Sequence, residues 1–508
     1  MFSGSGRRLM RFQQIAHCGI FLVLLLSAGF CVAAESSAKV EKEDNWQVIY
    51  LSGQRIGYSH TSIEPVEQDG KTVVRCSNIT NVTMKRFGQT LVMKQTLTTE
   101  ETVDGDMLRF SYESANPPAS STLTVGIVEG DQLKLKQTVN GKLKASSQTW
   151  RKDVKSPVFQ DRALRNSPLK PGESRSFEAF MPEFNKVATI KLNATDFEET
   201  TLLDAKGRRL LKVNMTQSVI PGLVMAGFVD DKGDTLKSST NMLGMEMITY
   251  QVNKGEALKV IAGAELDLAV NTLIKVKRIP DAHTTRKMRY RVTIKGQNPE
   301  SALPSGESQS VKKIGDDVAE VTVTSLPIPE KATIRPGEAE FLASSQYLQS
   351  DDERVKEHAN KAAGDAKDPA QIARRMEKYV HEKLDTKNFS TAMASAGEVA
   401  RTLEGDCTEH AVLLAAMLRA KGIPSRVVVG LVYVDSLSAF GGHMWTEANL
   451  DGHWLPLDAT LGRGGIGSAH LKLSDSSLAD DGPSAISSFA PLMLVIGQLQ
   501  IEVLGSGE

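Results

Sequence analysis

Alternation of apolar and polar residues, sustained from Trp46 to about Val260, is the feature that most limits how this chain can fold. Short stretches rich in Val, Ile, Thr and Tyr, such as "WQVIYLSGQRIGYSHTSIE" and "DAKGRRLLKVNMTQ", are separated by turn residues. A side-chain period of two places one set of residues on a core and the other set in solvent. The pattern predicts an antiparallel β-rich domain, which we place at residues 35–262.

A second, shorter β pattern follows. The stretches "RKMRYRVTIKG" and "VAEVTVTSLPIP" are typical of strands, and a Pro-bearing segment from Pro327 to Pro336 leads out of them. We expect a small β segment or domain at residues 263–340.

The spacing of apolar residues becomes helical after this segment. Asp368-Pro369 is a cap and first-turn pair, and apolar residues then recur at helical intervals. A strongly apolar helix is predicted over 407–421, ended by Gly422. Because such a helix has no polar face, we expect it to lie in a core. With the strand patterns that follow it, the sequence predicts an α+β domain at residues 341–508, including a C-terminal tail.

The first 34 residues have the layout of a secretory signal. Arg7, Arg8 and Arg11 precede a short apolar run, and Val32-Ala33-Ala34 supplies small residues before Glu35. We predict cleavage after Ala34 and export to the periplasm or the cell exterior. An uncleaved signal that anchors the chain in the membrane is the alternative.

Cleavage would remove two of the four cysteines. Cys18 and Cys31 lie in the signal, so the mature chain would keep Cys76 and Cys407. A disulfide between these two is the structural alternative to a reactive thiol. Cys76 lies in a strand-like stretch far from Cys407 in the sequence, so we expect no disulfide.

The charge balance limits the partners. The formal net charge is −1 and the isoelectric point is about 6.8. A nucleic-acid-binding chain would carry a basic excess or stripe, so we expect no nucleic-acid partner. Association with the cell envelope and the oligomeric state are left open.

The stretch "HMWTEANLDGHWLPLDAT" predicts a β-hairpin. Asp451-Gly452 between two alternating runs is a strong two-residue turn signal, and such a turn pairs Leu450 with His453. In this register, the polar face carries His443 on the first strand and Asp458 on the second, within diagonal reach of each other. The spacing therefore predicts an imidazole beside a carboxylate.

Cys407 opens the predicted apolar helix in "GDCTEHAVLLAAMLRAKGIPSR". A helix N-terminus and a nearby imidazolium both stabilise a thiolate. If the hairpin packs against this helix end, Cys407 would be a nucleophile, His443 its base and Asp458 the acid that orients the base. His410, three residues after the cysteine, is an alternative base that we expect to be structural.

These motifs resemble the core of the transglutaminase-like superfamily. The shared elements are G-D-C-x-E-H-A, G-I-P-x-R, H-x-W-x-E and D-A-T, in this order. The resemblance implies a papain-like α+β fold for roughly residues 345–475. It assigns the nucleophile to Cys407, the base to His443 and the orienting acid to Asp458. It implies a protein or peptide substrate and an amide bond attacked through a thioester.

An acyl-transfer site needs two donors for the oxyanion of the tetrahedral intermediate, and the Cys407 backbone N–H is the expected first one. The second donor is unassigned, with Asn388, Tyr347 and Gln346 as candidates. No metal motif is present, and the calcium sites of animal transglutaminases have no counterpart, so no cofactor is expected. We favour hydrolysis over transfer of the acyl group to an amine. The alternative function is an inactive envelope binding or scaffold protein that works through its β-rich region.

Overall fold

The computed structural model describes residues 40–506, except for 69, 117–119, 140, 260–265, 336–338, 386–387, 390–392 and 481–487. The predicted signal at residues 1–34, with Cys18 and Cys31, lies outside the described residues. Within the described part of the chain, no helix is both long and apolar enough to cross a membrane.

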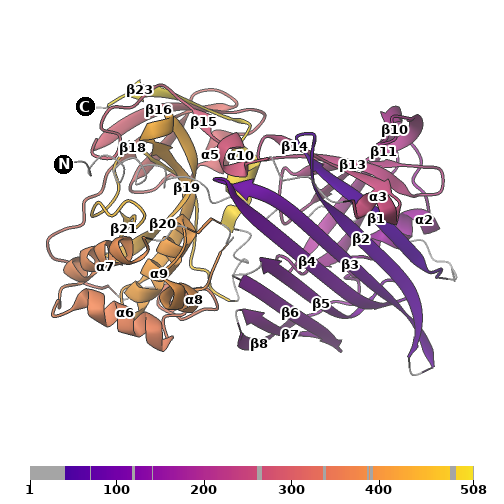
Figure 1. The fold of residues 1–508 in the computed structure, drawn as a ribbon, viewed down its shortest axis with the longest axis horizontal. Coiled ribbons are helices and arrows are strands. Elements are labelled where there is room, and N and C mark those ends of the chain that lie inside the picture. The colour runs from indigo at the N-terminus through magenta and orange to yellow at the C-terminus, as the bar shows by residue number, and fades with distance from the viewer. Residues whose placement is uncertain are drawn as a thin grey trace, which may run out of the picture. The chain divides into compact units, whose positions relative to one another are not determined.

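Two compact units make up the chain, one within residues 22–267 and the other formed mainly by residues 268–508 (Figure 1). The strands expected at 263–340 belong to the second unit. The predicted domain boundaries near residues 262 and 340 stay predictions.

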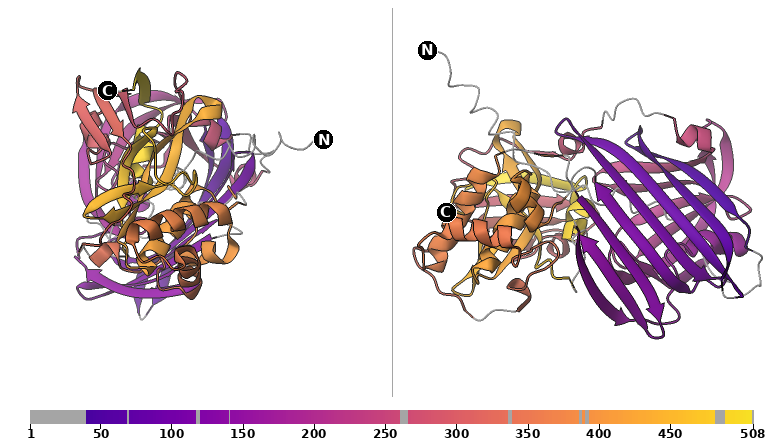
Figure 2. Two further views of the ribbon diagram at one scale, coloured as in Figure 1. Left: turned by 90° about the vertical axis from the view of Figure 1, so that its left-hand side faces the viewer. Right: turned by 60° about the horizontal axis from the view of Figure 1, so that its bottom comes forward.

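The first unit is built on one antiparallel sheet of 14 strands in the order β8-β7-β6-β5-β4-β3-β2-β1-β14-β13-β12-β11-β10-β9. Figure 2 shows its long strands running side by side in a curved sheet. The elements are β1 (Glu43–Leu51), β2 (Gln54–Gln68), β3 (Lys71–Arg86), β4 (Gln89–Thr102), β5 (Met107–Asn116), β6 (Ser120–Glu129), β7 (Gln132–Val139), β8 (Lys142–Thr149), α2 (Gln160–Asn166), β9 (Ser174–Met181), β10 (Lys186–Thr201), β11 (Gly207–Gln217), β12 (Val224–Val229), β13 (Thr235–Met242), β14 (Met245–Val252) and α3 (Lys254–Ala257).

Alternation explains this sheet. Along β4, buried and exposed residues follow one another from Leu91 to Gln95, as a half-buried strand requires. The buried side chains form a core that includes Phe110, Trp150 and Phe180. The predicted N-terminal antiparallel β region is confirmed.

The second unit holds a five-stranded sheet and a four-stranded sheet. The first has the order β15-β20-β19-β22 with β21 paired to β20, and the second has the order β17-β18-β16-β23. The elements are α4 (Leu268–Asn271), β15 (Ile274–Lys275), β16 (Lys287–Ile294), α5 (Pro299–Ala302), β17 (Gln309–Lys313), β18 (Val318–Thr324), η1 (Ala339–Phe341), α6 (Glu353–Ala363), α7 (Pro369–Lys383), α8 (Ala396–Thr402), α9 (Cys407–Ala420), β19 (Ser425–Val434), η2 (Asp435–Leu437), β20 (Ala439–Leu450), β21 (His453–Leu457), β22 (His470–Ser476), α10 (Ala490–Val495) and β23 (Leu499–Gly505).

Helix α9 and strands β19 and β20 form the centre of this unit. Every residue of α9 from Cys407 to Arg419 is buried, as the apolar sequence predicted. Figure 1 shows α6 to α9 grouped beside β19 and β20. From the four-stranded sheet, the Tyr290 hydroxyl donates to the Ser468 carbonyl at 2.9 Å, and its ring meets Phe440 edge-on. The central strands are therefore covered on both faces.

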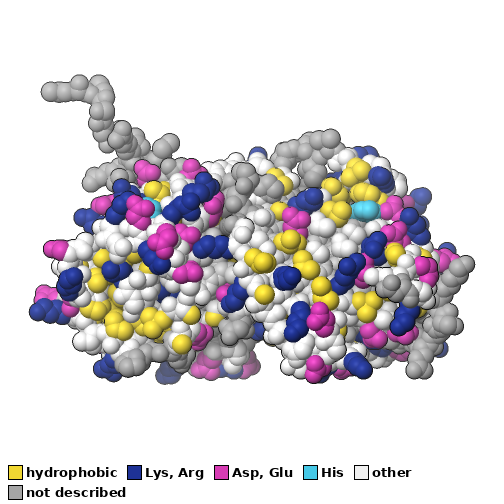
Figure 3. Space-filling model, turned by 90° about the horizontal axis from the view of Figure 1, so that it is seen from below, with side chains coloured by type: hydrophobic (Ala, Val, Ile, Leu, Met, Phe, Trp, Pro, Cys, Tyr) yellow, Lys and Arg dark blue, Asp and Glu magenta, His cyan; other side chains and the backbone are white. Residues whose placement is uncertain are grey.

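The surface carries charges of both signs. On the face drawn in Figure 3, basic and acidic side chains are interspersed with hydrophobic ones. This mixing fits a chain whose formal net charge is −1.

Candidate active site at the start of helix α9

The start of α9 is held by a capping box. Asp406 is the N-cap, and its side chain accepts the backbone N–H of Thr408 at 2.9 Å. The Glu409 carboxylate accepts the Asp406 backbone N–H at 3.0 Å, which closes the box. Gly405 has a φ of +147°, and a Cβ there would lie 2.3 Å from the Glu409 Cβ, so only glycine fits. These contacts fix where the helix begins, and Cys407 is its first residue.

Glu409 also ties this helix start to the preceding chain. Its second oxygen accepts the backbone N–H of Ala394 at 2.9 Å, and its side chain is buried. Burial, together with the charge of Asp406, raises the pKa of Glu409 to about 8. The side chain therefore supports the site as a structural acceptor.

The predicted hairpin is confirmed. Asp451 and Gly452 both have positive φ values, 57° and 87°, as a type I′ turn requires. Leu450 pairs with His453, and the ladder continues to Thr446 opposite Leu457. The expected polar face, however, is buried as well, because both faces of β20 are covered by other parts of the unit.

His443 and Asp458 meet as the register predicted. His443 Nε2 lies 2.8 Å from Asp458 Oδ2, and both side chains are fully buried. The other carboxylate oxygen accepts the backbone N–H groups of Thr460 at 2.9 Å and Leu461 at 3.3 Å. Although burial raises the pKa of Asp458, the charge of His443 and the hydrogen bonds from both neighbouring histidines hold it well below its ordinary value.

Cys407 joins this pair. Burial disfavours a charged His443, but the charge and hydrogen bond of Asp458, and then those of Cys407, outweigh it and raise the pKa of His443 to about 10. Because Nε2 is engaged by Asp458, Nδ1 is the ring atom that remains for the thiol. The structure thus brings all three predicted site residues together.

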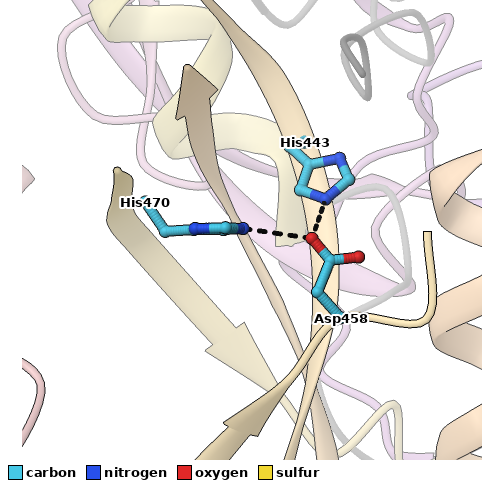
Figure 4. A group of neighbouring side chains, drawn as sticks. All are labelled: His443, Asp458 and His470. Atoms are coloured by element: carbon cyan, nitrogen blue, oxygen red, sulfur yellow. Dashed lines mark hydrogen bonds and ion pairs between the residues drawn. The ribbon is translucent and has the colours of Figure 1, made fainter. Parts of the chain in front are cut away.

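His470 is a site residue that the sequence did not predict. Its Nε2 lies 3.0 Å from the same Asp458 oxygen that His443 contacts (Figure 4). It comes from β22, which pairs with β19 and not with β20. Nothing in the spacing of "SAHLKLSD" indicates this contact, because it depends on the order of strands in the sheet.

Glu377 on α7 holds the chain around Asp458. Its carboxylate accepts the backbone N–H of Asp458 at 2.9 Å and that of Gly465 at 3.0 Å. Burial is the main cause that raises the pKa of Glu377 to about 8. His381, one turn later, lies 3.0 Å from the Ala459 carbonyl. Helix α7 therefore fixes the segment that presents Asp458.

His410 and the three candidates for the second oxyanion donor make hydrogen bonds outside the pair of His443 and Asp458. His410 bonds through Nδ1 to the Asp406 carbonyl, one turn back in α9, which fits a structural role. Gln346 donates its backbone N–H to Asp480 Oδ1 at 2.8 Å, and the Tyr347 carbonyl accepts from Ala396. Asn388 lies 3.5 Å from Glu404. The second oxyanion donor stays open.

Neither Cys76 nor Cys407 forms a disulfide, and both are buried. His443, Asp458 and His470 each offer one atom that could bind a metal ion, and these atoms lie within 4.8 Å of one another. Both histidine contacts converge on one oxygen at hydrogen-bond length, a geometry that shared protons satisfy.

Comparison with known proteins agrees with this geometry. Residues 356–459 match the family model of the transglutaminase-like superfamily. This segment contains Cys407, His443 and Asp458 but ends before His470. No curated protein matches the chain.

Solved structures give weaker likenesses. A candidate cysteine protease from Cytophaga hutchinsonii is 15% identical, with 44% of this chain and 89% of that chain covered and a TM-score of 0.30. A β-barrel-like protein from Brucella abortus, a domain of unknown function, is 13% identical, with 41% and 96% covered and a TM-score of 0.30. The periplasmic domain of TgpA from Pseudomonas aeruginosa is 16% identical, with 35% and 91% covered and a TM-score of 0.22. These TM-scores are too low to support an inference.

Proposed function

Because residues 356–459 form a transglutaminase-like core, we propose that the protein is a cysteine enzyme that acts on amide bonds of proteins or peptides. Cys407 is the nucleophile, His443 the general base and acid, and Asp458 the residue that orients His443. The observation that carries this proposal is that His443 Nε2 lies 2.8 Å from Asp458 Oδ2, while both Asp458 and Cys407 raise the pKa of His443.

The first half of the reaction forms a thioester. The Cys407 thiolate attacks the amide carbonyl carbon, and the Cys407 backbone N–H is one donor that stabilises the oxyanion that develops. When the tetrahedral intermediate collapses, the C–N bond breaks and the His443 imidazolium gives its proton to the leaving amine. Asp458 keeps the ring oriented throughout and stabilises its charge.

The second half releases the acyl group. His443, now neutral, takes a proton from water, and the resulting hydroxide attacks the thioester. The C–S bond breaks, which releases a carboxylic acid and restores the thiolate and imidazolium. An amine in place of water would give a new amide and make the enzyme a cross-linker. We favour water as the acceptor, because transfer requires the thioester to be kept from water.

The proposal includes export. The signal-like residues 1–34 would direct the chain out of the cytoplasm, and the mature protein would begin at Glu35. N-terminal sequencing of the protein from a native host fraction tests this step. Retention of the first 34 residues on a membrane-bound form would contradict cleavage.

An acceptor assay tests the activity. The mature protein is incubated with casein, with and without a labelled primary amine, beside the Cys407→Ala variant as a matched control. We expect Cys407-dependent release of free acid or peptide that exceeds amine incorporation. Amine incorporation in excess of hydrolysis would identify the enzyme as a transferase. An alkylation rate of Cys407 that falls from pH 7 to pH 5 as steeply as that of an ordinary thiol, with no turnover, would instead favour the scaffold alternative.

A further inference from the structure

The Asp458 carboxylate has an unusually complete set of donors. Its Oδ2 accepts from His443 Nε2 at 2.8 Å and His470 Nε2 at 3.0 Å. Its Oδ1 accepts from two backbone N–H groups. An ionised carboxylate can only accept hydrogen bonds, so both histidines must carry a proton on Nε2. The contact therefore fixes the tautomer of His470 as well as that of His443.

His470 has little freedom to do anything else. It is fully buried, and its Nδ1 has no hydrogen-bond partner in the described part of the chain. Its ring meets Trp445 edge-on at 5.3 Å and His283 edge-on at 6.1 Å. A buried polar atom without a hydrogen-bond partner costs free energy, and Nδ1 is such an atom. The hydrogen bond from Nε2 to Asp458 offsets part of the cost of burying this imidazole.

The two histidines are not equivalent. His443 faces the thiol, and its pKa is raised to about 10, so it carries a charge at neutral pH. Burial, and then the charge of His443, lower the pKa of His470, although Asp458 opposes this. His470 is thus a neutral donor that adds a hydrogen bond to Asp458 without adding a second positive charge.

We propose that His470 is a positioning residue for the reaction. Its Nε2–H holds the Asp458 carboxylate in the plane in which it meets His443, and thereby stabilises the pair formed by the Cys407 thiolate and the His443 imidazolium. This inference rests on the proposed function, because it assumes that Cys407 reacts as a thiolate. It assigns a role to a residue outside the segment matched by the family model.

The titratable groups around His443, Asp458 and His470 define the pH range in which an effect of His470 on Cys407 reactivity can be measured. Three titratable groups face these residues: Cys407 from α9, Glu377 from α7 and His283 from the segment before β16. His283 in turn faces Asp435 and Arg463. Burial lowers the pKa of His283 to about 3, and that of Glu377 is raised to about 8. Between about pH 4 and pH 7, His283 and Glu377 therefore keep their protonation states, and the acid limb of Cys407 reactivity reports on the thiolate–imidazolium pair together with any protonation of His470.

Two substitutions separate a donor from a space-filling residue. In His470→Gln, the amide nitrogen can reach the position of Nε2 and donate to Asp458. In His470→Leu, a similar volume is filled but no donor remains. A third variant, His470→Asn, is polar but too short to reach the carboxylate, and it replaces the leucine variant if that protein does not fold.

The experiment measures iodoacetamide alkylation of the Cys407 peptide by mass spectrometry from pH 4 to pH 7, with unfolding followed for each variant. We expect His470→Gln to stay within about threefold of the wild type. We expect His470→Leu to move the acid limb up by about one pH unit, a tenfold loss of thiolate at a given pH. In an Asp458→Asn background, the leucine substitution should add almost nothing, because the residue acts through Asp458.

The outcomes are distinguishable. If the alkylation rate of wild-type Cys407 falls from pH 7 to pH 5 as steeply as that of an ordinary thiol, the proposed function fails and the inference fails with it. If the wild type shows an acid-stable thiolate but His470→Leu or His470→Asn leaves the acid limb unmoved, only the role of His470 is overturned. Equal shifts in the glutamine and leucine variants would also overturn it, since packing alone would then explain them.

Discussion

Each unit of the protein buries a carboxylate beside a cationic side chain, and the two pairs differ in their donors. In the first unit, Glu101 lies against Arg162, with both side chains almost fully buried. In the second, Asp458 lies against His443. Burial raises the pKa of Glu101 despite the charge of Arg162, whereas Asp458 has a pKa well below its ordinary value.

The number of hydrogen-bond donors decides whether a buried carboxylate stays ionised. Asp458 accepts hydrogen bonds from two imidazoles and two backbone N–H groups, which together outweigh the cost of burial. Glu101 accepts from the Arg162 guanidinium, and Ser156 and the charge of Lys155 also lower its pKa, but burial outweighs these contributions. A second difference is the neighbour: His443 faces a thiol, while Arg162 donates to backbone carbonyls of residues 102 and 103. We therefore expect the first pair to serve stability and the second to serve chemistry.

The strongest test of this contrast removes the reacting groups. Cys407→Ala and His443→Ala should each lower kcat/KM by about 10³-fold or more, and the double variant should lose little beyond either one, because members of a triad act as a unit. Turnover of a cleavable peptide or casein measures the effect. Multiplication of the two losses in the double variant would contradict a shared mechanism.

A milder change keeps the size of the Asp458 side chain but removes its negative charge. Asp458→Asn should lower kcat by about 10²-fold to 10³-fold, because the amide no longer stabilises the imidazolium and favours the wrong tautomer of His443. The fold should persist, since the backbone donors at Thr460 and Leu461 can still be accepted. Steady-state kinetics and circular dichroism on the same preparation check both statements. A variant with wild-type kcat would remove Asp458 from the mechanism.

The matched change in the first unit should affect stability alone. Arg162→Met leaves Glu101 buried without its cation, and we expect a loss of about 3 kcal/mol in the free energy of unfolding at pH 7. The double variant Glu101→Gln, Arg162→Met should recover part of that loss. Denaturant unfolding measures it, and Cys407 alkylation serves as the control that should not change. An altered alkylation rate in folded Arg162→Met protein would contradict the expectation that the Glu101–Arg162 pair serves stability alone.

The last test concerns the pH dependence of folding stability at Glu377, which supports Asp458 from α7. Its pKa rises to about 8 in the folded state from an ordinary value of 4.5, so the unfolded chain releases this proton at lower pH than the folded one. Folding stability therefore falls as pH rises from about 4.5 to about 8 and then levels off. Glu377→Gln keeps an acceptor for Asp458 and Gly465 but lacks this penalty.

We expect the free energy of unfolding of Glu377→Gln to rise relative to the wild type between pH 5 and pH 8, by up to about 4 kcal/mol, measured by urea unfolding at several pH values. A constant difference between the two proteins over this range would show that Glu377 titrates normally.

The sequence predicted those parts of the site that depend on neighbouring residues. The hairpin register follows from the turn at Asp451-Gly452 and from alternation along two adjacent strands, and it places His443 and Asp458 together. The start of α9 follows from the cap at Asp406 and the apolar run after Cys407. These signals are local, so no knowledge of strand order is needed to use them.

Contacts set by strand order or by helix packing could not be predicted in this way. His470 reaches Asp458 because β22 pairs with β19, and Glu377 does so because α7 packs against the same segment. The sequence also predicted an antiparallel β region without showing that β1 and β14 pair, which joins all fourteen strands into one sheet. Several alternative pairings would bury the same alternating residues equally well.

The burial of Cys407 has a further consequence. Its side chain is only 2% exposed, at the first turn of a helix buried along nearly its whole length. Peroxide and low-molecular-weight disulfides attack thiolates that solvent can reach, and a protein outside the cytoplasm meets both. A thiolate kept under the surface would form sulfenic acid slowly, even though it is a strong nucleophile toward a bound carbonyl. For the proposed exported enzyme, enclosure of the sulfur would separate catalytic reactivity from oxidative damage and lessen the need for a reductase to restore it.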